Sequence, residues 1–226
     1  MSSQINATGS SIDLVTTPAT GAREPKRKRG HIRVAAIMQA GVELFETKGY
    51  EATTMTEIAT RSGTATASLY RFFPSKEALA DALLVQYAQH VINSLGDLRE
   101  RAAGMTLDDI AEGLVAFRLD LQSQRKFAVE LADARGGSAN KQQEFRAAIL
   151  GGLAALILQG VPGATKAKAD AMAVVLLHTL KVVTMIGQEK PATRRKLLGE
   201  IKTLIRAYLA SATKHADSRN PQPLAG

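Results

Sequence analysis

The amino-acid sequence predicts an all-α protein of about nine helices. Ala, Leu, Glu, Lys, Gln and Arg, which have high helix propensity, dominate most of the 226 residues. Alternating runs of Val, Ile and Thr, which are typical of strands, are missing. Apolar side chains recur instead at steps of three and four residues. With 45% hydrophobic residues, the chain is long enough to bury a core of its own.

The N-terminal residues separate into a polar tail and a basic arm. Residues 1–25 are rich in Ser, Thr, Gly, Ala and Pro without any period, which is typical of disorder. Residues 23–33 hold six basic side chains against one acid, a net charge of +5, whereas residues 34–75 have a net charge of −1. The positive charge therefore lies in the arm, in particular on Lys26, Arg27, Lys28 and Arg29.

The first expected helix runs from about Ile32 to Lys48. Gly49 ends it, because glycine readily adopts the left-handed conformation that closes a helix. Its apolar positions follow a helical period and are Val34, Ile37, Met38, Gly41, Leu44 and Phe45.

Two short helices are expected next. Thr54 and Glu57 have the spacing of a capping box, in which the Thr hydroxyl and the Glu carboxylate accept from each other's backbone N–H. Gly63 ends this helix, and a second one spans about 65–72 until Pro74 disfavours helical geometry at Phe73. Ser75 is a plausible N-cap for the helix that follows.

The remaining helices are expected at about 75–102, 106–123, 125–135, 139–160, 165–187 and 193–213. Val161-Pro162-Gly163 predicts a turn. Gly151 and Gly152 lie inside a helix, where they lower stability, so they indicate either a close helix approach or space for a ligand.

The segment Thr54–Phe73 has the spacing of a helix-turn-helix that binds DNA. Such a motif needs a small residue where its helices approach, here Ala59, and a glycine in the turn, here Gly63. Ile58, Leu69 and Phe72 supply apolar contacts. An ordinary helical hairpin has the same spacing, so the spacing alone leaves both interpretations open.

The flanking residues favour DNA binding. Residues 44–79, LFETKGYEATTMTEIATRSGTATASLYRFFPSKEAL, closely resemble the DNA-binding segment of the tetracycline-repressor (TetR/AcrR) family of bacterial transcriptional regulators. The match covers about a sixth of the chain. The matching elements are Leu44-Phe45, Gly49-Tyr50, Thr53-Thr54, Ile58-Ala59, Gly63, Leu69-Tyr70, Phe73, Ser75-Lys76-Glu77 and Leu79.

The resemblance implies DNA contacts for matching residues. It implies phosphate contacts for Tyr70 and Lys76, and Thr54 would help to place backbone N–H groups on a phosphate. It also implies contacts to bases or to the nearby DNA backbone for Thr56, Thr66, Ala67, Ser68 and Arg71. The Arg71 side chain can make a bidentate contact to guanine. The alternative is that it is solvated or bound to a phosphate. Thr64 and Ala65 depart from the family pattern, where Val and then Ser or Thr are common, and Pro74 replaces a commonly polar residue.

The basic arm has two interpretations. Lys26, Arg27, Lys28 and Arg29 would follow phosphates or enter a minor groove, as the arms of homeodomains do. The alternative is a flexible, solubilising tail.

The resemblance also implies a homodimer on a palindromic operator, paired through the last two helices. Apolar stripes in 165–187 and 193–213 agree with this, although burial in a single chain's core gives the same pattern. Candidate interface residues are Val175, Thr179, Val183, Leu197, Ile201, Leu204 and Tyr208.

The resemblance further implies that a cavity among the middle helices binds a small effector. Candidate lining residues are Tyr87, Phe117, Leu121, Phe127, Leu131, Phe145, Ile149 and His178, with plain core packing as the alternative for each. For His178, in the apolar stretch AVVLLHTLKVV, a core position is the favoured interpretation.

Several function classes lack support in the sequence. The chain has no cysteine, its four histidines have no metal-ligand spacing, and neither a catalytic cluster nor a Walker loop is present. We therefore expect no enzyme, metal or cofactor. The longest apolar run, residues 147–158, is too short to cross a bilayer, so we expect a cytoplasmic, nucleoid-associated protein without a membrane partner.

These observations predict four segments: a disordered tail with a basic arm (1–30), a three-helix DNA-binding domain (31–75), a helical ligand-binding and dimerisation domain (76–213) and a flexible tail (214–226). The leading hypothesis is a homodimeric repressor that a small, hydrophobic ligand releases from a palindromic operator. One alternative is an activator or protein-partnered DNA-binding factor without a ligand. Another is a helical enzyme or carrier that does not bind DNA.

Overall fold

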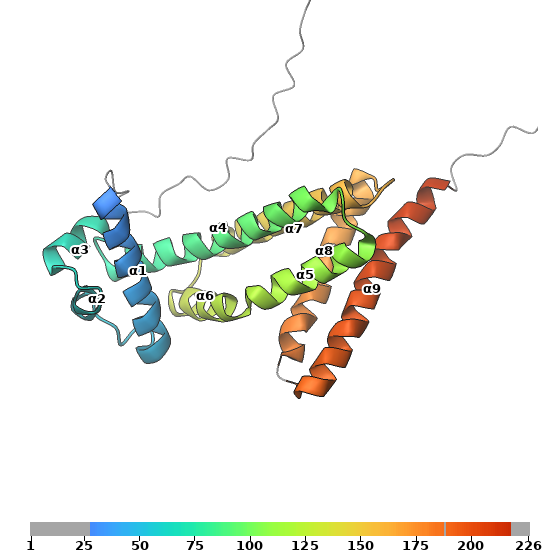
Figure 1. Ribbon diagram of the computed structural model, residues 1–226. Helices are drawn as coiled ribbons and strands as arrows, with labels where there is room; N and C mark the ends of the chain where they lie inside the picture. Colours follow the sequence, from blue (N-terminus) through green and yellow to red (C-terminus); the bar gives the residue numbers. More distant parts are fainter. Residues whose placement is uncertain (1–27, 188, 218–226) are drawn as a thin grey trace, which may run out of the picture.

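The computed structural model describes residues 28–187 and 189–217, and this part of the chain is all-α (Figure 1). Within it lie nine helices: α1 (Lys28–Lys48), α2 (Met55–Arg61), α3 (Thr66–Phe72), α4 (Lys76–Ala102), α5 (Leu107–Asp120), α6 (Gln122–Ala134), α7 (Ala139–Gly160), α8 (Lys166–Ile186) and α9 (Pro191–Asp217). The predicted fold class is confirmed.

Two helices are longer than the sequence pattern indicated. α1 begins at Lys28 rather than near Ile32, because the basic residues before Ile32 are themselves good helix formers. α9 begins at Pro191, where proline is well tolerated in a first turn, and continues to Asp217, past the boundary expected at residue 213.

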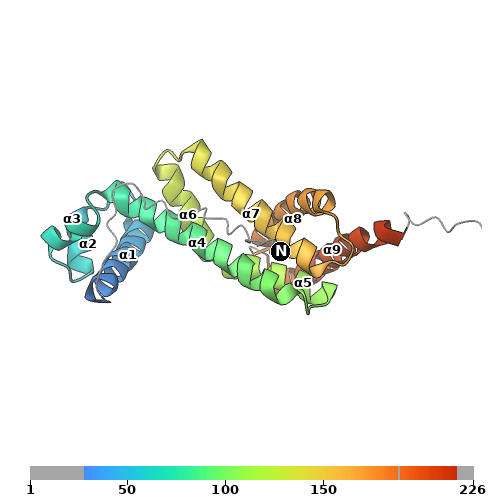
Figure 2. The same cartoon turned by 90° about the horizontal axis from the view of Figure 1, so that it is seen from above.

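The molecule is elongated, with α1–α3 gathered at one end (Figures 1 and 2). α4 runs from this head into the body, where it packs against α5, α6 and α7. In the body α7 packs on α8, and α9 packs on α5 and α8. The fold therefore consists of a small head and a larger helical body that share one long helix.

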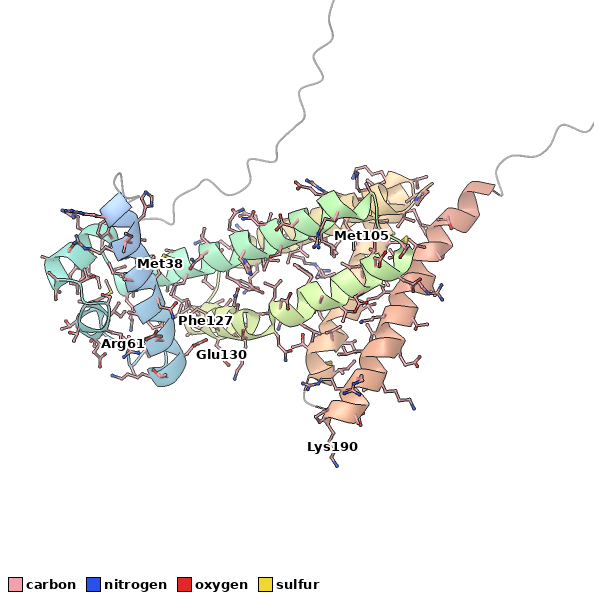
Figure 3. The ribbon with its side chains drawn as sticks, in the orientation of Figure 1. Met38, Arg61, Met105, Phe127, Glu130 and Lys190 are labelled. Atoms are coloured by element: carbon pink, nitrogen blue, oxygen red, sulfur yellow. The ribbon has the colours of Figure 1, made fainter. Side chains whose placement is uncertain are left out.

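Each part has its own hydrophobic core, and α4 contributes to both. Its first half places Leu79 and Leu83 in the head core with Ile37 and Ile58. Its second half places Leu95 and Leu98 in the body core. α6 joins the two parts as well, because Leu131 is buried in the head core and Phe127 packs against it (Figure 3).

The adjacent glycines of α7 have different surroundings. A Cβ on Gly152 would lie 2.6 Å from Leu95 Cδ2, so this glycine permits the close approach of α4 and α7. A Cβ on Gly151 would have no heavy atom within 4 Å, and this residue is exposed. The sequence left open a close helix approach or space for a ligand, and Gly152 fits the close approach.

α8 is long and apolar enough to cross a membrane when judged by length and composition alone, with a mean hydropathy of 1.7. Core helices pass the same test, and one side of α8 is buried in the body core. The buried side consists of Ala169, Met172, Ala173, Leu176, Leu180, Val183 and Ile186.

The surroundings of the two α7 glycines predict opposite effects of the same substitution. Gly151→Ala is expected to raise the free energy of unfolding by about 0.5–1 kcal/mol through better helix propensity. Gly152→Ala is expected to overpack Leu95, which costs about 1–3 kcal/mol and offsets that gain. Urea denaturation of both variants measures the difference, and equal stabilities would contradict the close approach of α4 and α7.

Candidate DNA-binding interface

The start of α2 is fixed by a complete capping box. Thr54 Oγ1 accepts from the backbone N–H of Glu57 at 3.3 Å, and the Glu57 carboxylate accepts from Thr54 N–H at 2.9 Å. Lys48, at the end of α1, forms an ion pair with the same carboxylate. This ion pair first, and then the bonds to Thr54, lower the pKa of Glu57 to about 2. α2 is therefore anchored to α1 at its first turn.

The turn between α2 and α3 is a Schellman motif centred on Gly63. Gly63 has a φ of +62°, in the region that favours glycine, and its N–H donates to the Thr60 carbonyl oxygen at 3.2 Å. Thr64 N–H donates to the Ala59 carbonyl oxygen at 2.9 Å. The sequence predicted this turn correctly, because few residues other than glycine adopt that φ without strain.

α3 divides into a buried and an exposed side. Leu69 and Phe72 are buried in the head core. Tyr70 is 46% exposed, and Arg71 is exposed with its guanidinium 5.3 Å from the centre of the Phe72 ring. The other side chains that α3 leaves accessible are small: Thr66 and Ala67 are exposed and Ser68 is half-buried.

The first turns of α1 lie beside α3. Arg33 Nη1 donates to Ser68 Oγ at 3.4 Å, which joins α1 to the exposed side of α3. Arg29 is exposed on the preceding turn. The sequence alone did not indicate Arg33 as a site residue, although the residue lies in the basic segment 23–33. Only the packing of α1 against the motif brings its side chain to this surface.

Other basic side chains of the head are engaged within the protein. Arg61 of α2 pairs with Glu43 of α1, with Nη2 and Oε2 2.6 Å apart, and this bond lowers the pKa of Glu43. Lys48 pairs with Glu57. Arg29, Arg33 and Arg71 are absent from the ion pairs of the described residues, so they form the cationic part of this surface.

Lys76 has a position that its sequence context did not indicate. Its ammonium donates to three backbone carbonyls of the α1–α2 loop: Tyr50 at 2.8 Å, Glu51 at 3.1 Å and Thr53 at 3.1 Å. It also lies 4.5 Å from the centre of the Tyr50 ring. An ammonium has three N–H donors, so these bonds leave none for a phosphate. In this structure Lys76 fastens α4 to the loop that precedes α2.

The remaining predicted DNA contacts are distributed as follows. Thr54 and Thr56 are exposed at the start of α2. Lys28 and Arg29 belong to the first turn of α1 rather than to an irregular arm. Lys26 and Arg27 lie outside the described residues.

The predicted ligand-lining residues do not converge on one site. Phe117 and Leu121 line an open cavity of about 430 Å³ between α4 and α5. The rings of Tyr87 and Phe145 pack 5.9 Å apart between α4 and α7. Phe127 and Leu131 belong to the head core, and Ile149 packs against the body core.

The expectation that His178 is a core residue is wrong. Its side chain is exposed on α8, with Nε2 3.4 Å from Arg146 Nη2. The apolar stretch around it misled the prediction, because α8 keeps an exposed apolar side as well as a buried one.

The predicted interface residues differ in exposure. Val175 and Leu204 are 45% and 55% exposed. Val183 is fully buried in the body core, so it is not available to a second chain. The others, Thr179, Leu197, Ile201 and Tyr208, are half-buried.

Comparison with known proteins gives a family for the head. Residues 37–83 match the sequence profile of "Bacterial regulatory proteins, tetR family". An HTH-type transcriptional regulator of Bacillus subtilis, YvkB, is 34% identical over 74 residues, which cover 33% of this chain and 37% of that protein. The HTH-type transcriptional repressor DrrR1 of Streptomyces coeruleorubidus is 34% identical over 86 residues, or 37% of this chain and 32% of that protein. The alignments thus span about a third of these relatives' length.

Solved structures extend the likeness to the fold of the body. A TetR-family transcriptional regulator from Mesorhizobium loti superimposes with a TM-score of 0.59 at 21% identity, covering 82% of this chain and 98% of that one. A γ-butyrolactone receptor superimposes with a TM-score of 0.50 at 23% identity, covering 79% and 98%. Residues 37–83 of the chain thus match the helix-turn-helix DNA-binding domain of the tetR family of bacterial regulatory proteins.

Proposed function

We propose that the protein is a homodimeric transcriptional repressor that binds a palindromic operator and leaves it when a small molecule binds the helical body. The observation that carries the proposal is the exposed side of α3, small and polar around Tyr70 and Arg71, on a motif fixed by a capping box and a glycine turn. Residues 31–75 act as the DNA-binding domain and residues 76–213 as the ligand-binding and dimerisation domain.

On DNA, α3 enters the major groove. Thr66, Ala67 and Ser68 lie against bases or the adjacent backbone, where small side chains permit close approach. Tyr70, Thr54 and Thr56 contact the backbone, and Arg71 binds either a guanine edge or a phosphate. Arg33 joins them, because it already reaches Ser68.

The terminal helices supply the dimer interface. α8 and α9 pack side by side, and both keep apolar side chains exposed, among them Val175, Met185 and Leu204. Exposed apolar surface of this kind is typical of a protein interface. A second copy of the chain is the partner we propose, since two copies on one axis match two half-sites of a palindrome.

α6 provides the connection between the body and the head. Leu131 is buried in the head core, and Arg135, just after α6, pairs with Asp81 of α4 at 2.7 Å. A ligand that shifts α6 therefore shifts the head, and it releases DNA if it binds better to the shifted state. The relative DrrR1 is named a transcriptional repressor, which supports repression as the function. The structural neighbour is named a γ-butyrolactone receptor, which supports a small-molecule effector.

The direct test is a mobility-shift assay with the region upstream of the protein's own gene. We expect a shift that unlabelled copies of the same DNA compete away and an unrelated promoter of equal length does not. A small hydrophobic effector is expected to abolish it. Binding without sequence preference would contradict an operator-specific regulator, and a shift that a screen of such compounds leaves intact would favour the activator or protein-partnered factor.

Lys76 and Arg71 are expected to differ in their effect on DNA binding. Lys76→Met removes the donor to three carbonyls, so we expect a lower melting temperature and an unchanged slope of log K against log salt. Arg71→Met is expected to keep the melting temperature and weaken operator binding, because the side chain is exposed. A salt slope reduced by about one unit in Lys76→Met, without loss of stability, would instead indicate a phosphate contact.

Removal of residues 1–27 tests the basic arm. The deletion spares α1 and removes Arg23, Lys26 and Arg27. We expect weaker binding to every DNA sequence and a salt slope reduced by about one unit for each phosphate that the arm no longer neutralises. A truncated protein with the full-length slope would show that the arm is only a solubilising tail.

Acidic substitutions on α8 and α9 test the dimer. Val175→Asp and Leu204→Asp place a charge in the proposed apolar interface, so light scattering is expected to show a monomer with much weaker operator binding. Gln124→Asp, on the exposed side of α6, is the matched control and is expected to stay dimeric. Dimeric Leu204→Asp and Val175→Asp proteins would exclude this surface as the interface.

A further inference from the structure

Arg118 of α5 is a buried cation in the body. Only 9% of its surface is exposed. Its Nε donates to the Leu180 carbonyl oxygen at 3.1 Å, and its Nη2 donates to Thr184 Oγ1. Both partners lie on α8, and both are uncharged.

No carboxylate among the described residues pairs with this guanidinium. The nearby charged group is a second cation, Arg125 of α6, and the described ion pairs do not include either arginine. Burial in the first place, and then the charge of Arg125, lower the pKa of Arg118. A largely buried charge without a counterion is unfavourable, and an anion beside this guanidinium would lower that cost.

The two bonds of Arg118 leave one edge of the guanidinium free. Nε and Nη2 donate from the side that faces α8, so both N–H groups of Nη1 and the second N–H of Nη2 have no partner in the described part of the chain. The Nη1–Nη2 edge presents two parallel N–H groups. This geometry matches the two oxygens of a carboxylate.

Aromatic side chains lie close to this pair of arginines. The Tyr87 phenol of α4 is among the groups that affect the pKa of Arg118, and burial raises the pKa of Tyr87 itself. Its hydroxyl is a hydrogen-bond donor. Tyr87 packs on Phe145 of α7. Both rings are half-buried and therefore retain surface for an apolar group.

We infer that Arg118, Arg125 and Tyr87 bind the carboxylate of an amphipathic small molecule whose apolar part lies against Tyr87 and Phe145. This inference rests on the proposed function, because it names the chemical class of the effector. The open cavity between α4 and α5 is a separate place, and its lining carries both acids, Asp97 and Asp120, and the cation Arg101.

The site also indicates how binding reaches the head. Arg118 lies on α5 and Arg125 near the start of α6, so a carboxylate between them replaces their repulsion by attraction. α6 then moves toward α5, and its far end carries Leu131 into the head core. The same anion that neutralises the arginines therefore shifts the helix that connects body and head.

The test compares straight-chain carboxylates from acetate to decanoate with primary alcohols of the same length, by thermal shift at constant ionic strength. We expect the longer carboxylates to raise the melting temperature of the full-length protein more than their matched alcohols do. Arg118→Gln keeps N–H donors for α8 but removes the charge. It is expected to be at least as stable as the parent without ligand, and to bind the carboxylates about tenfold more weakly or worse.

Two further variants keep the test decisive. Arg125→Gln, at a half-buried position, is expected to weaken carboxylate binding too, and it replaces Arg118→Gln if that protein does not fold. Arg99→Gln, on the exposed side of α4, removes the same charge and is expected to bind as the parent does. Alcohols that stabilise as much as carboxylates, no carboxylate that stabilises, or undiminished binding in both arginine variants would each overturn the inference.

The same ligands in the mobility-shift assay separate this inference from the proposed function. If carboxylates bind through Arg118 but leave the operator complex intact, the site is confirmed and ligand-controlled release is wrong. If an alcohol releases the operator equally well from the parent and from Arg118→Gln, ligand control is confirmed and the carboxylate site is wrong.

Discussion

The shared helix α4 is the constraint on which the rest of the structure depends. One uninterrupted helix buries Leu79 and Leu83 in the head core and Leu95 and Leu98 in the body core. A helix of this length transmits a tilt or shift along its axis because its backbone hydrogen bonds resist bending. The close approach of α7 at Gly152 and of α5 at Gly113, both against α4 leucines, fixes its position in the body.

α6 connects the same two parts by a different route, and the two connections are unequal. α4 is embedded in both cores, whereas α6 meets the head through Phe127, Leu131 and the Arg135–Asp81 ion pair. Its other end carries Arg125, whose charge lowers the pKa of the largely buried Arg118 of α5. The body thus carries two positive charges, on Arg118 and Arg125, at one end of α6. The other end of α6 packs on the head. Under the function proposed above, this arrangement is the means by which a small ligand acts on DNA binding.

The head separates structural charges from charges that remain accessible. Lys48, Arg61 and Lys76 hold α1, α2 and α4 together through carboxylates and carbonyls. Arg33, Arg71 and Tyr70 stay on the surface. The near-neutral charge of residues 34–75 therefore does not argue against DNA binding, because the accessible cations lie on the α3 side and at the start of α1.

The sequence by itself determined the local structure: the helices, the capping box at Thr54, the turn at Gly63 and the exposed positions of α3 follow from propensity, period and φ preference, which act within a few residues. It also carried the family resemblance that the comparisons confirmed. Tertiary structure alone decided the partners of long side chains. Lys76 binds carbonyls of a loop distant in sequence, Arg33 reaches Ser68, and Arg118 meets Leu180 and Thr184 on α8. No local pattern encodes such contacts, because they depend on how whole helices pack.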